Sequence, residues 1–185
     1  MNNGKYTIDH IGVVVADLDA AVRTYVDSLG FRQLYRETIA HRGVEVVGLT
    51  AGDSTIELIR PLDASSPVAR YRGDAPTKLH HVGYRVANLD GELARVRAAG
   101  VRLIDEKPQA GAHGLRGAFL HPASTAGVLI ELCQHQHSSN PNPTRDWSFP
   151  KGEASSMVPL MMVATALAGV TIGWALGKAQ NLRNP

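Results

Sequence analysis

The hydrophobic and polar positions of the chain follow a pattern that occurs twice. An apolar strand pattern over 6–15 leads into a helical pattern that ends near Gly30, and the same order recurs over 78–86 and up to Gly100. Within each copy, apolar residues first alternate and then recur at helical spacing. An Asp or Asn before each helical pattern is typical of an N-cap, and a glycine after it favours a left-handed C-terminus. The pattern therefore predicts two strand–helix units of one design.

Further strand patterns follow each predicted helix, separated by the Gly, Pro, Asp and Ser residues typical of turns. They cover 31–37, 44–49 and 54–61 in the first copy, and 101–107, 115–120 and 127–134 in the second. Each copy thus predicts a βαβββ module, at about 5–64 and 77–135, with a short helix or turn in the connector. Because one helix covers only one face of such a sheet, we expect an α+β fold in which the modules pair into a shared eight-stranded cup.

The repeat extends to individual polar residues. At an offset of 71 positions, His10 matches His81 and Gly12 matches Gly83. Alternation along a strand places His10 and Gly12 on one face. By the same alternation, His80 is expected to point away from the cup. Two packing accidents would not recur in register with the same residue types, so the paired histidines indicate a shared site.

Each module also carries a carboxylate within apolar sequence near its end, Glu57 in STIELI and Glu131 in GVLIELC. An ionised carboxylate in such a strand requires a partner, a metal or water. Together with His10 and His81 these residues supply two imidazoles and two carboxylates, one pair from each module. Zn, Co, Ni, Mn and Fe all accept this combination, and such a site can leave positions open for substrate oxygens. The sequence predicts a divalent metal site.

Composition and charge exclude other classes of function. The 19 Lys and Arg and 17 Asp and Glu residues are scattered and give a net charge of +2, so no nucleic-acid surface is indicated. Cys133 is the single cysteine, which excludes an internal disulfide. The N-terminus lacks the apolar segment of a signal peptide, so we expect a cytoplasmic catalytic domain.

The character of the chain changes after about residue 135. The segment 136–156 is polar and rich in Pro, Ser and Asn, as flexible linkers are. From 157 to 176 no charged residue occurs over twenty positions, close to the length of a membrane-spanning helix. Glycines recur there every fourth position, which lets membrane helices approach closely. We expect a transmembrane helix at 157–177 that tethers the domain to a membrane, followed by a short polar tail, 178–185.

Several longer motifs can be compared with known families. They are IELIRPLDASSPVARY at 56–71, RLIDEKPQAGAHG at 102–114, FLHP at 119–122 and STAGVLIEL at 124–132. With the repeat and its paired histidines, they resemble the vicinal oxygen chelate superfamily, and within it the methylmalonyl-CoA epimerase family. The resemblance covers about residues 5–135. It implies that His10, Glu57, His81 and Glu131 bind a divalent metal such as Co, Mn, Zn or Ni.

The implied reaction is the interconversion of (2R)- and (2S)-methylmalonyl-CoA through a metal-stabilised enediolate, in propionyl-CoA metabolism. An epimerase needs an acid/base on each face of the planar intermediate. The family implicates Glu131 as one, and Glu45 is the candidate for the other. An ungapped alignment of RGV, however, sets Val46 at the position of the family's glutamate. Glu57 is then the alternative second acid/base.

The remaining implications concern the substrate and the assembly. The GAHG turn borders the substrate in the family, so Gly111, His113 and Gly114 are expected to contact the acyl-CoA. The family resemblance also implies a homodimer. Two other functions use the same cup: a lyase of the glyoxalase I type acting on a glutathione adduct, and a non-catalytic protein that binds a small molecule. An extradiol dioxygenase is disfavoured because its iron takes two His and one carboxylate.

Overall fold

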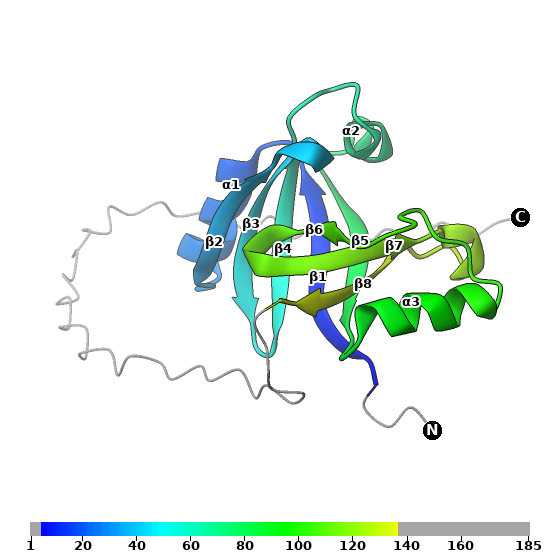
Figure 1. Ribbon diagram of the computed structural model, residues 1–185. Helices are drawn as coiled ribbons and strands as arrows, with labels where there is room; N and C mark the ends of the chain where they lie inside the picture. The colour runs from blue at the N-terminus through cyan, green and yellow to red at the C-terminus, as the bar shows by residue number, and fades with distance from the viewer. Residues whose placement is uncertain (1–4, 137–185) are drawn as a thin grey trace, which may run out of the picture. The chain divides into compact units, whose positions relative to one another are not determined.

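The elements of the first module are organised around its first and last strands. A computed structural model of the chain describes residues 5–136 (Figure 1). The module consists of β1 (Thr7–Val15), α1 (Leu18–Arg23), the π-helical turn η1 (Thr24–Ser28), β2 (Gln33–Ile39), the 3-10 turn η2 (Ala40–Arg42), β3 (Val44–Ala51) and β4 (Ser54–Pro61). A short helix, α2 (Pro67–Arg72), follows in the connector, where a helix or turn was expected.

The second module repeats this order. It consists of β5 (Thr77–Arg85), α3 (Leu89–Ala98), β6 (Gln109–Ala110), the 3-10 turn η3 (Ala112–Gly114), β7 (Leu115–Leu120), the 3-10 turn η4 (Pro122–Ser124) and β8 (Ile130–His135). The predicted linker beyond residue 136, the hydrophobic segment 157–177 and the tail 178–185 lie outside the described residues. Between residues 5 and 136, no helix has the length and apolar character needed to cross a bilayer.

The strands form a single eight-stranded sheet in the order β2-β3-β4-β1-β5-β8-β7-β6. Within each module the first and last strands are parallel neighbours, β1 with β4 and β5 with β8. The antiparallel pairing of β1 with β5 joins the modules. The sheet curls so that β6 and β7 face β2 and β3 across it (Figure 1). The expected α+β class with a shared eight-stranded sheet is therefore confirmed.

One helix covers the outer face of each half of the sheet. Leu18 of α1 packs with Val47 and Leu58, and Leu93 of α3 packs with Leu132. A third apolar cluster occupies the inner face of the first module beside α2, and its buried members are Val14, Val44, Val46 and Ile59. Because side chains alternate along a strand, one face of each strand packs against a helix and the other faces the cup. Burial of the apolar residues stabilises this arrangement.

The helix ends follow the sequence signals. Asp17 caps α1 through the Ala20 amide, and Asn88 caps α3 through the Gly91 amide. Gly30 and Gly100 adopt φ values of 75° and 84°, as the left-handed ends of the predicted helices require. The first helical stretch is not uniform, because α1 passes into the π-helical turn η1 after Arg23.

One predicted strand is wrong. The stretch 101–107 forms only an isolated bridge between Leu103 and Leu120, and the edge strand β6 is reduced to Gln109–Ala110. The side chain of Asp105 accepts the amide of Phe119 at 3.0 Å, taking a ladder position that backbone would otherwise fill. Pro108 has no N–H to offer the sheet. Local side-chain and proline chemistry thus outweighs the apolar pattern here.

Candidate metal centre

Four buried polar side chains meet on the central strands of the sheet. They come from β1, β4, β5 and β8 and are His10, Glu57, His81 and Glu131, each exposing between 1% and 8% of its surface. Cross-strand register brings them together, because Gly12 of β1 pairs with Glu57 on one side and with His81 on the other. The second module mirrors this arrangement around Gly83, which pairs with His10 and Glu131.

The donor atoms converge on one point. The Nε2 atom of His10 lies 2.9 Å from Nε2 of His81 and 2.9 Å from Oε2 of Glu131. Oε2 of Glu131 is 3.6 Å from Nε2 of His81, and Oε2 of Glu57 is 3.9 Å from Nε2 of His10. Ligands held ~2.0–2.2 Å from a common ion lie roughly 3–4 Å apart by that geometry. The residue types and the separations therefore both fit a divalent metal.

The electrostatics of the cluster also favour a cation. Burial opposes ionisation of Glu131, but contacts with His10 and His81 outweigh it and lower the pKa of Glu131 to about 2. Burial likewise opposes protonation of His10, yet the surrounding carboxylates, Glu57 foremost, raise the pKa of His10 well above its usual value. Two carboxylates thus attract positive charge to the point where the two imidazoles meet.

Glu57 is held by a residue of the edge strand β2. The hydroxyl of Tyr35 donates to Oε1 of Glu57 at 2.6 Å. The other carboxylate oxygen of Glu57, Oε2, lies 3.9 Å from Nε2 of His10. Burial, reinforced by the charge of Glu57, raises the pKa of Tyr35, so the phenol keeps its proton and acts as a donor. Tyr35 therefore fixes which oxygen of Glu57 faces the centre.

Both histidines of the cluster, His10 and His81, follow a β-bulge. Ile8 pairs with Tyr84 and His10 with Gly83, so Asp9 is the extra residue on β1. Gly12 pairs with His81 and Val13 with Leu79, so His80 is the extra residue on β5. The positions match at the repeat offset of 71. A bulge changes the direction in which a side chain points, which simple alternation does not allow for.

The bulge overturns the prediction for His80. Its Nδ1 atom lies 2.8 Å from Nδ1 of His81, and its ring packs against those of Tyr71 and Phe119. Burial, with the nearby His81, lowers the pKa of His80 to about 4, so its imidazole is neutral. His80 thus borders the cluster of His10, His81 and Glu131 instead of pointing away from it.

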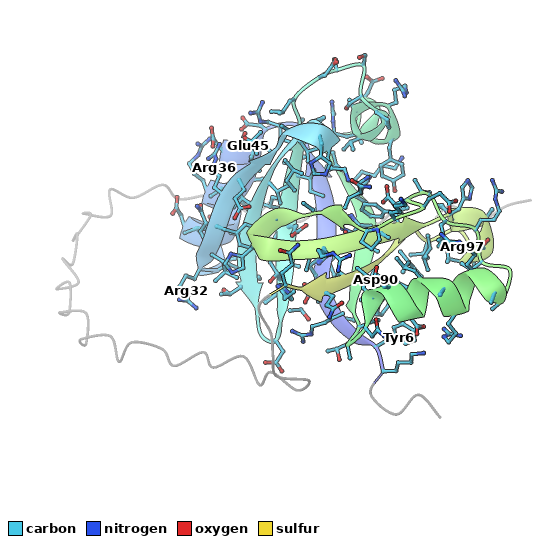
Figure 2. The ribbon with its side chains drawn as sticks, viewed as in Figure 1. Tyr6, Arg32, Arg36, Glu45, Asp90 and Arg97 are labelled. Carbon is cyan, nitrogen blue, oxygen red and sulfur yellow. The ribbon has the colours of Figure 1, made fainter. Side chains whose placement is uncertain are left out.

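Glu45 lies elsewhere, on the outer face of β3. Its carboxylate accepts from Nε of Arg36 at 2.7 Å and from a guanidinium nitrogen of Arg60 at 2.5 Å. Arg36 also binds Asp19 of α1, and Figure 2 shows Glu45 and Arg36 together beside β2. Hydrogen bonds from the two arginines lower the pKa of Glu45. The structure does not bring Glu45 to His10 and His81, and the inner position next to it is Val46, within the apolar cluster.

The GAHG turn forms η3 and lies against β2 across the cup. The ring of His113 stacks on that of Tyr35, with centroids 5.0 Å apart and planes 9° from parallel. The His113 amide donates to Glu37 at 3.1 Å, and His113 adopts φ 52°, a region that favours glycine. Through Tyr35, this turn is connected to Glu57. Gly111 and Gly114 flank His113, and their predicted contact with acyl-CoA stays a prediction.

Sequence reasoning missed three residues that surround the centre. The sequence pattern gives Tyr35 no role beyond that of a strand residue, and it gives Phe119 that of a core residue. In the structure the ring of Phe119 lies 5.1 Å from that of His81, centroid to centroid. Asp9 stands next to a proposed ligand, but alternation assigns it to the opposite face. The sequence did contain one signal for Asp9: at the repeat offset of 71 it matches His80, so each histidine of the pair is preceded by a polar residue.

The sequence is similar to proteins of one superfamily. The sequence model of the glyoxalase/bleomycin resistance protein/dioxygenase superfamily matches residues 9–119. The chain belongs to this superfamily. The ethylmalonyl-CoA/methylmalonyl-CoA epimerase of Cereibacter sphaeroides is 34% identical over 129 residues, which are 69% of this chain and 96% of that protein. The mitochondrial methylmalonyl-CoA epimerase of Bos taurus is 33% identical over 128 residues, 69% of this chain and 73% of that protein.

Solved structures of the superfamily agree with the described fold. Methylmalonyl-CoA epimerase from Mycobacterium tuberculosis has a TM-score of 0.68 and 34% identity, covering 72% of this chain and 91% of its own. A methylmalonyl-CoA epimerase in complex with methylmalonyl-CoA and NH4+ has a TM-score of 0.68 and 32% identity, covering 72% and 97%. The resemblance to the methylmalonyl-CoA epimerase family is therefore confirmed.

Proposed function

We propose that this chain is a methylmalonyl-CoA epimerase that interconverts the (2R) and (2S) forms of its substrate. One observation carries the proposal: two buried carboxylates, one from each module, converge on a pair of histidines. Relatives that are 33–34% identical to this chain over 128–129 residues bear that activity in their names. The acyl-CoA substrate and the place of the reaction in propionyl-CoA metabolism follow from the same proposal.

The metal ligands in this proposal are His10, His81, Glu131 and Glu57. Their imidazole nitrogens and carboxylate oxygens suit Co, Mn, Zn or Ni. When bound, the metal would polarise the thioester carbonyl and so stabilise the negative charge that develops as the α-proton leaves. The buried setting excludes bulk water from that charge, which strengthens each electrostatic interaction at the site.

The proton-transfer groups are assigned to Glu131 and Glu57. Glu131 is buried, with Oε2 2.9 Å from Nε2 of His10, and its carboxylate can accept a proton from a substrate bound at this point. Glu57 enters from the other module, next to β1 instead of β5, and therefore approaches a bound substrate from a different side. Epimerisation requires an acid/base on each face of the planar intermediate, and Glu57 supplies the second in place of the outward-facing Glu45.

The function is tested by proton exchange at the α-carbon. The full-length protein, loaded with Co²⁺, is incubated with (2R)-methylmalonyl-CoA in deuterated water, and deuterium in the ester is followed by mass spectrometry. We expect exchange with inversion in the wild type and its loss in His81→Ala. Asp90→Asn is the control, since Asp90 is exposed and pairs with Arg116. No exchange in metal-loaded wild type would overturn the proposal and make a glutathione adduct, the glyoxalase I type of substrate, the next one to assay.

The role of Glu57 is tested by Glu57→Gln. Glutamine keeps an oxygen donor for the metal but cannot take up a proton, so we expect epimerisation to fall by about a hundredfold or more. Exchange without inversion should persist at the face served by Glu131. Tyr35→Phe leaves the carboxylate in place and removes only its hydrogen bond, so a smaller loss is expected. Inversion at the wild-type rate in Glu57→Gln at full Co²⁺ occupancy would assign the second proton transfer to another group.

The homodimer implied by the family resemblance stays a prediction, to be checked by light scattering of the purified chain.

A further inference from the structure

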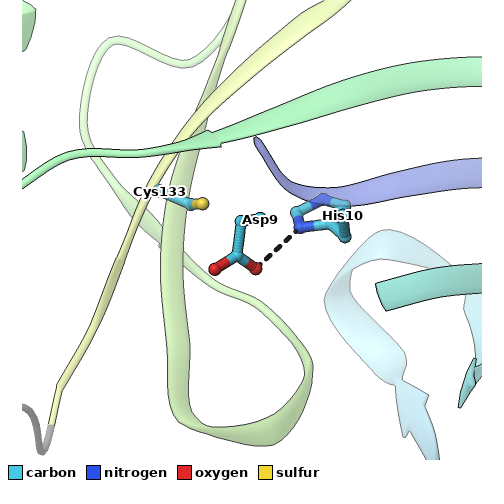
Figure 3. A group of neighbouring side chains, drawn as sticks. All are labelled: Asp9, His10 and Cys133. Carbon is cyan, nitrogen blue, oxygen red and sulfur yellow. Dashed lines mark hydrogen bonds and ion pairs between the residues drawn. The ribbon is translucent and has the colours of Figure 1, made fainter. Parts of the chain in front are cut away.

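We propose that Asp9 is a positioning residue of the metal centre, which fixes the orientation of His10 and presents its Nε2 atom to the metal. Oδ1 of Asp9 lies 3.2 Å from Nδ1 of His10, and both side chains are buried (Figure 3). This inference rests on the metal ligands proposed above. It adds a residue that no part of the predicted site included.

The β-bulge explains how two consecutive residues can face one another. In a regular strand, Asp9 and His10 would point to opposite faces of the sheet. Because Asp9 is the extra residue between the Ile8–Tyr84 and His10–Gly83 pairs, its side chain turns out of that alternation. Its carboxylate reaches the ring nitrogen of His10 that lies opposite the metal-facing one.

Two side chains of the second module contact the other carboxylate oxygen of Asp9. Oδ2 of Asp9 lies 3.0 Å from Nε2 of His135 on β8 and 3.7 Å from a guanidinium nitrogen of Arg85 on β5. One carboxylate oxygen of Asp9 therefore contacts His10, while the other contacts His135 and Arg85 of the second module. The placement of a ligand from the first module thus depends on two side chains of the second.

The chemistry of imidazole gives this contact a consequence for metal binding. A neutral histidine carries one N–H and one lone pair, and it can bind a metal through Nε2 only when the hydrogen is on Nδ1. A carboxylate that accepts this Nδ1 hydrogen fixes the tautomer and the ring orientation and makes Nε2 a stronger donor. Asp9 is placed to do this for His10.

The repeat supplies an internal comparison. His80 occupies the position of Asp9 in the second module, and its Nδ1 atom lies 2.8 Å from Nδ1 of His81. A neutral imidazole can accept the corresponding hydrogen of His81, but it brings no negative charge. The two histidine ligands are therefore supported unequally, and His10 should depend more on Asp9 than His81 does on His80.

The test is Co²⁺ binding by the full-length protein, measured by calorimetry and by the visible absorption of the bound ion. We expect Asp9→Asn to raise the Co²⁺ dissociation constant by about tenfold to a hundredfold and to change the absorption spectrum, as loss of such a partner does at other metal centres. Asp9→Ala should weaken binding further, and His80→Leu less. Asp90→Asn, which removes an exposed carboxylate, should bind Co²⁺ as the wild type does.

A second variant separates positioning from folding. His135→Leu removes the brace behind Asp9 without touching His10, and weaker Co²⁺ binding by a folded His135→Leu protein supports the role even if Asp9→Asn does not fold. Wild-type affinity and spectrum in folded Asp9→Asn, or wild-type affinity in His135→Leu where Asp9→Asn is unfolded, would overturn the inference and leave the proposed function standing. If the wild type itself binds no Co²⁺, both fail together.

Discussion

At the scale of single residues, glycines determine how closely the proposed ligands can approach one another. A Cβ atom on Gly83 would lie 2.2 Å from Cε1 of His10, and one on Gly12 would lie 2.2 Å from Cε1 of His81. Each histidine therefore occupies the space left by a glycine of the other module. This explains why, in both copies of the repeat, a glycine follows the histidine by two positions. The sequence shows this spacing but gives no reason for it.

Gly83→Ala should displace His10 and so weaken Co²⁺ binding, with a loss of stability of about 1–3 kcal/mol from overpacking. Urea unfolding and Co²⁺ titration measure the two effects. Gly111→Ala is the comparison for Co²⁺ binding: its new methyl would also be crowded, 3.3 Å from Cδ2 of Leu115, but outside the cluster, so Co²⁺ affinity should stay at the wild-type level. A Gly83→Ala protein with wild-type stability and affinity would show that the ring of His10 can shift at little cost.

At the scale of elements, a buried carboxylate ties α3 to the segment before β1. Glu92 of α3 accepts from Arg95 at 2.5 Å and also contacts Lys5 and Tyr6. Hydrogen bonds from Arg95 foremost outweigh the effect of burial and lower the pKa of Glu92 from 4.5 to about 2. The helix of the second module is thereby bound to residues that lead into the first strand of the first module.

The lowered pKa of Glu92 gives stability a defined dependence on pH. The unfolded chain takes up a proton on Glu92 more readily than the folded one, so this contribution is present above about pH 4.5 and is lost as pH falls through about 2. Glu92→Gln should cost roughly 1–3 kcal/mol at neutral pH and flatten the loss of stability across that range. Urea unfolding at several pH values measures this. Glu106→Gln, which removes an exposed pair with Arg97, is the control and should keep the wild-type dependence of stability on pH. If Glu92→Gln shows that same dependence, the pH effect does not come from Glu92.

At the scale of the whole described fold, side chains connect the modules across the cup as well as along the sheet. Arg42 of η2 binds both oxygens of Asp105 at 3.0 and 2.8 Å, and its guanidinium lies over the ring of Phe119. On the same side, His113 stacks on Tyr35. The two ends of the curled sheet are therefore held together across the cup.

Arg42→Gln should destabilise the protein by about 1–3 kcal/mol, because it leaves the largely buried carboxylate of Asp105 without its charged partner. The double variant Arg42→Gln/Asp105→Asn should cost less than the sum of the single changes, as coupled partners do. Arg116→Gln, which breaks an exposed pair with Asp90, should change stability by less than ~1 kcal/mol. Additive losses in urea unfolding would mean that Arg42 and Asp105 act independently.

The sequence by itself determined the two modules, their shared sheet and the four residues proposed as ligands. Period and repetition carry that information, because each module must bury one face against its helix and the repeated His and Glu residues then fall on the other. Helix limits such as Asn88 and Gly100 were predictable for the same local reason.

Only the tertiary structure decided which side chains meet. The bulges at Asp9 and His80 depend on the register between β1 and β5, which no periodicity within either strand contains. Tyr35 reaches Glu57 because β2 curls over the cup, and the predicted strand 101–107 yields to a side-chain contact of Asp105 with β7. Local pattern sets the face of each residue, whereas contacts between residues distant in the chain arise only when the sheet has paired and curled.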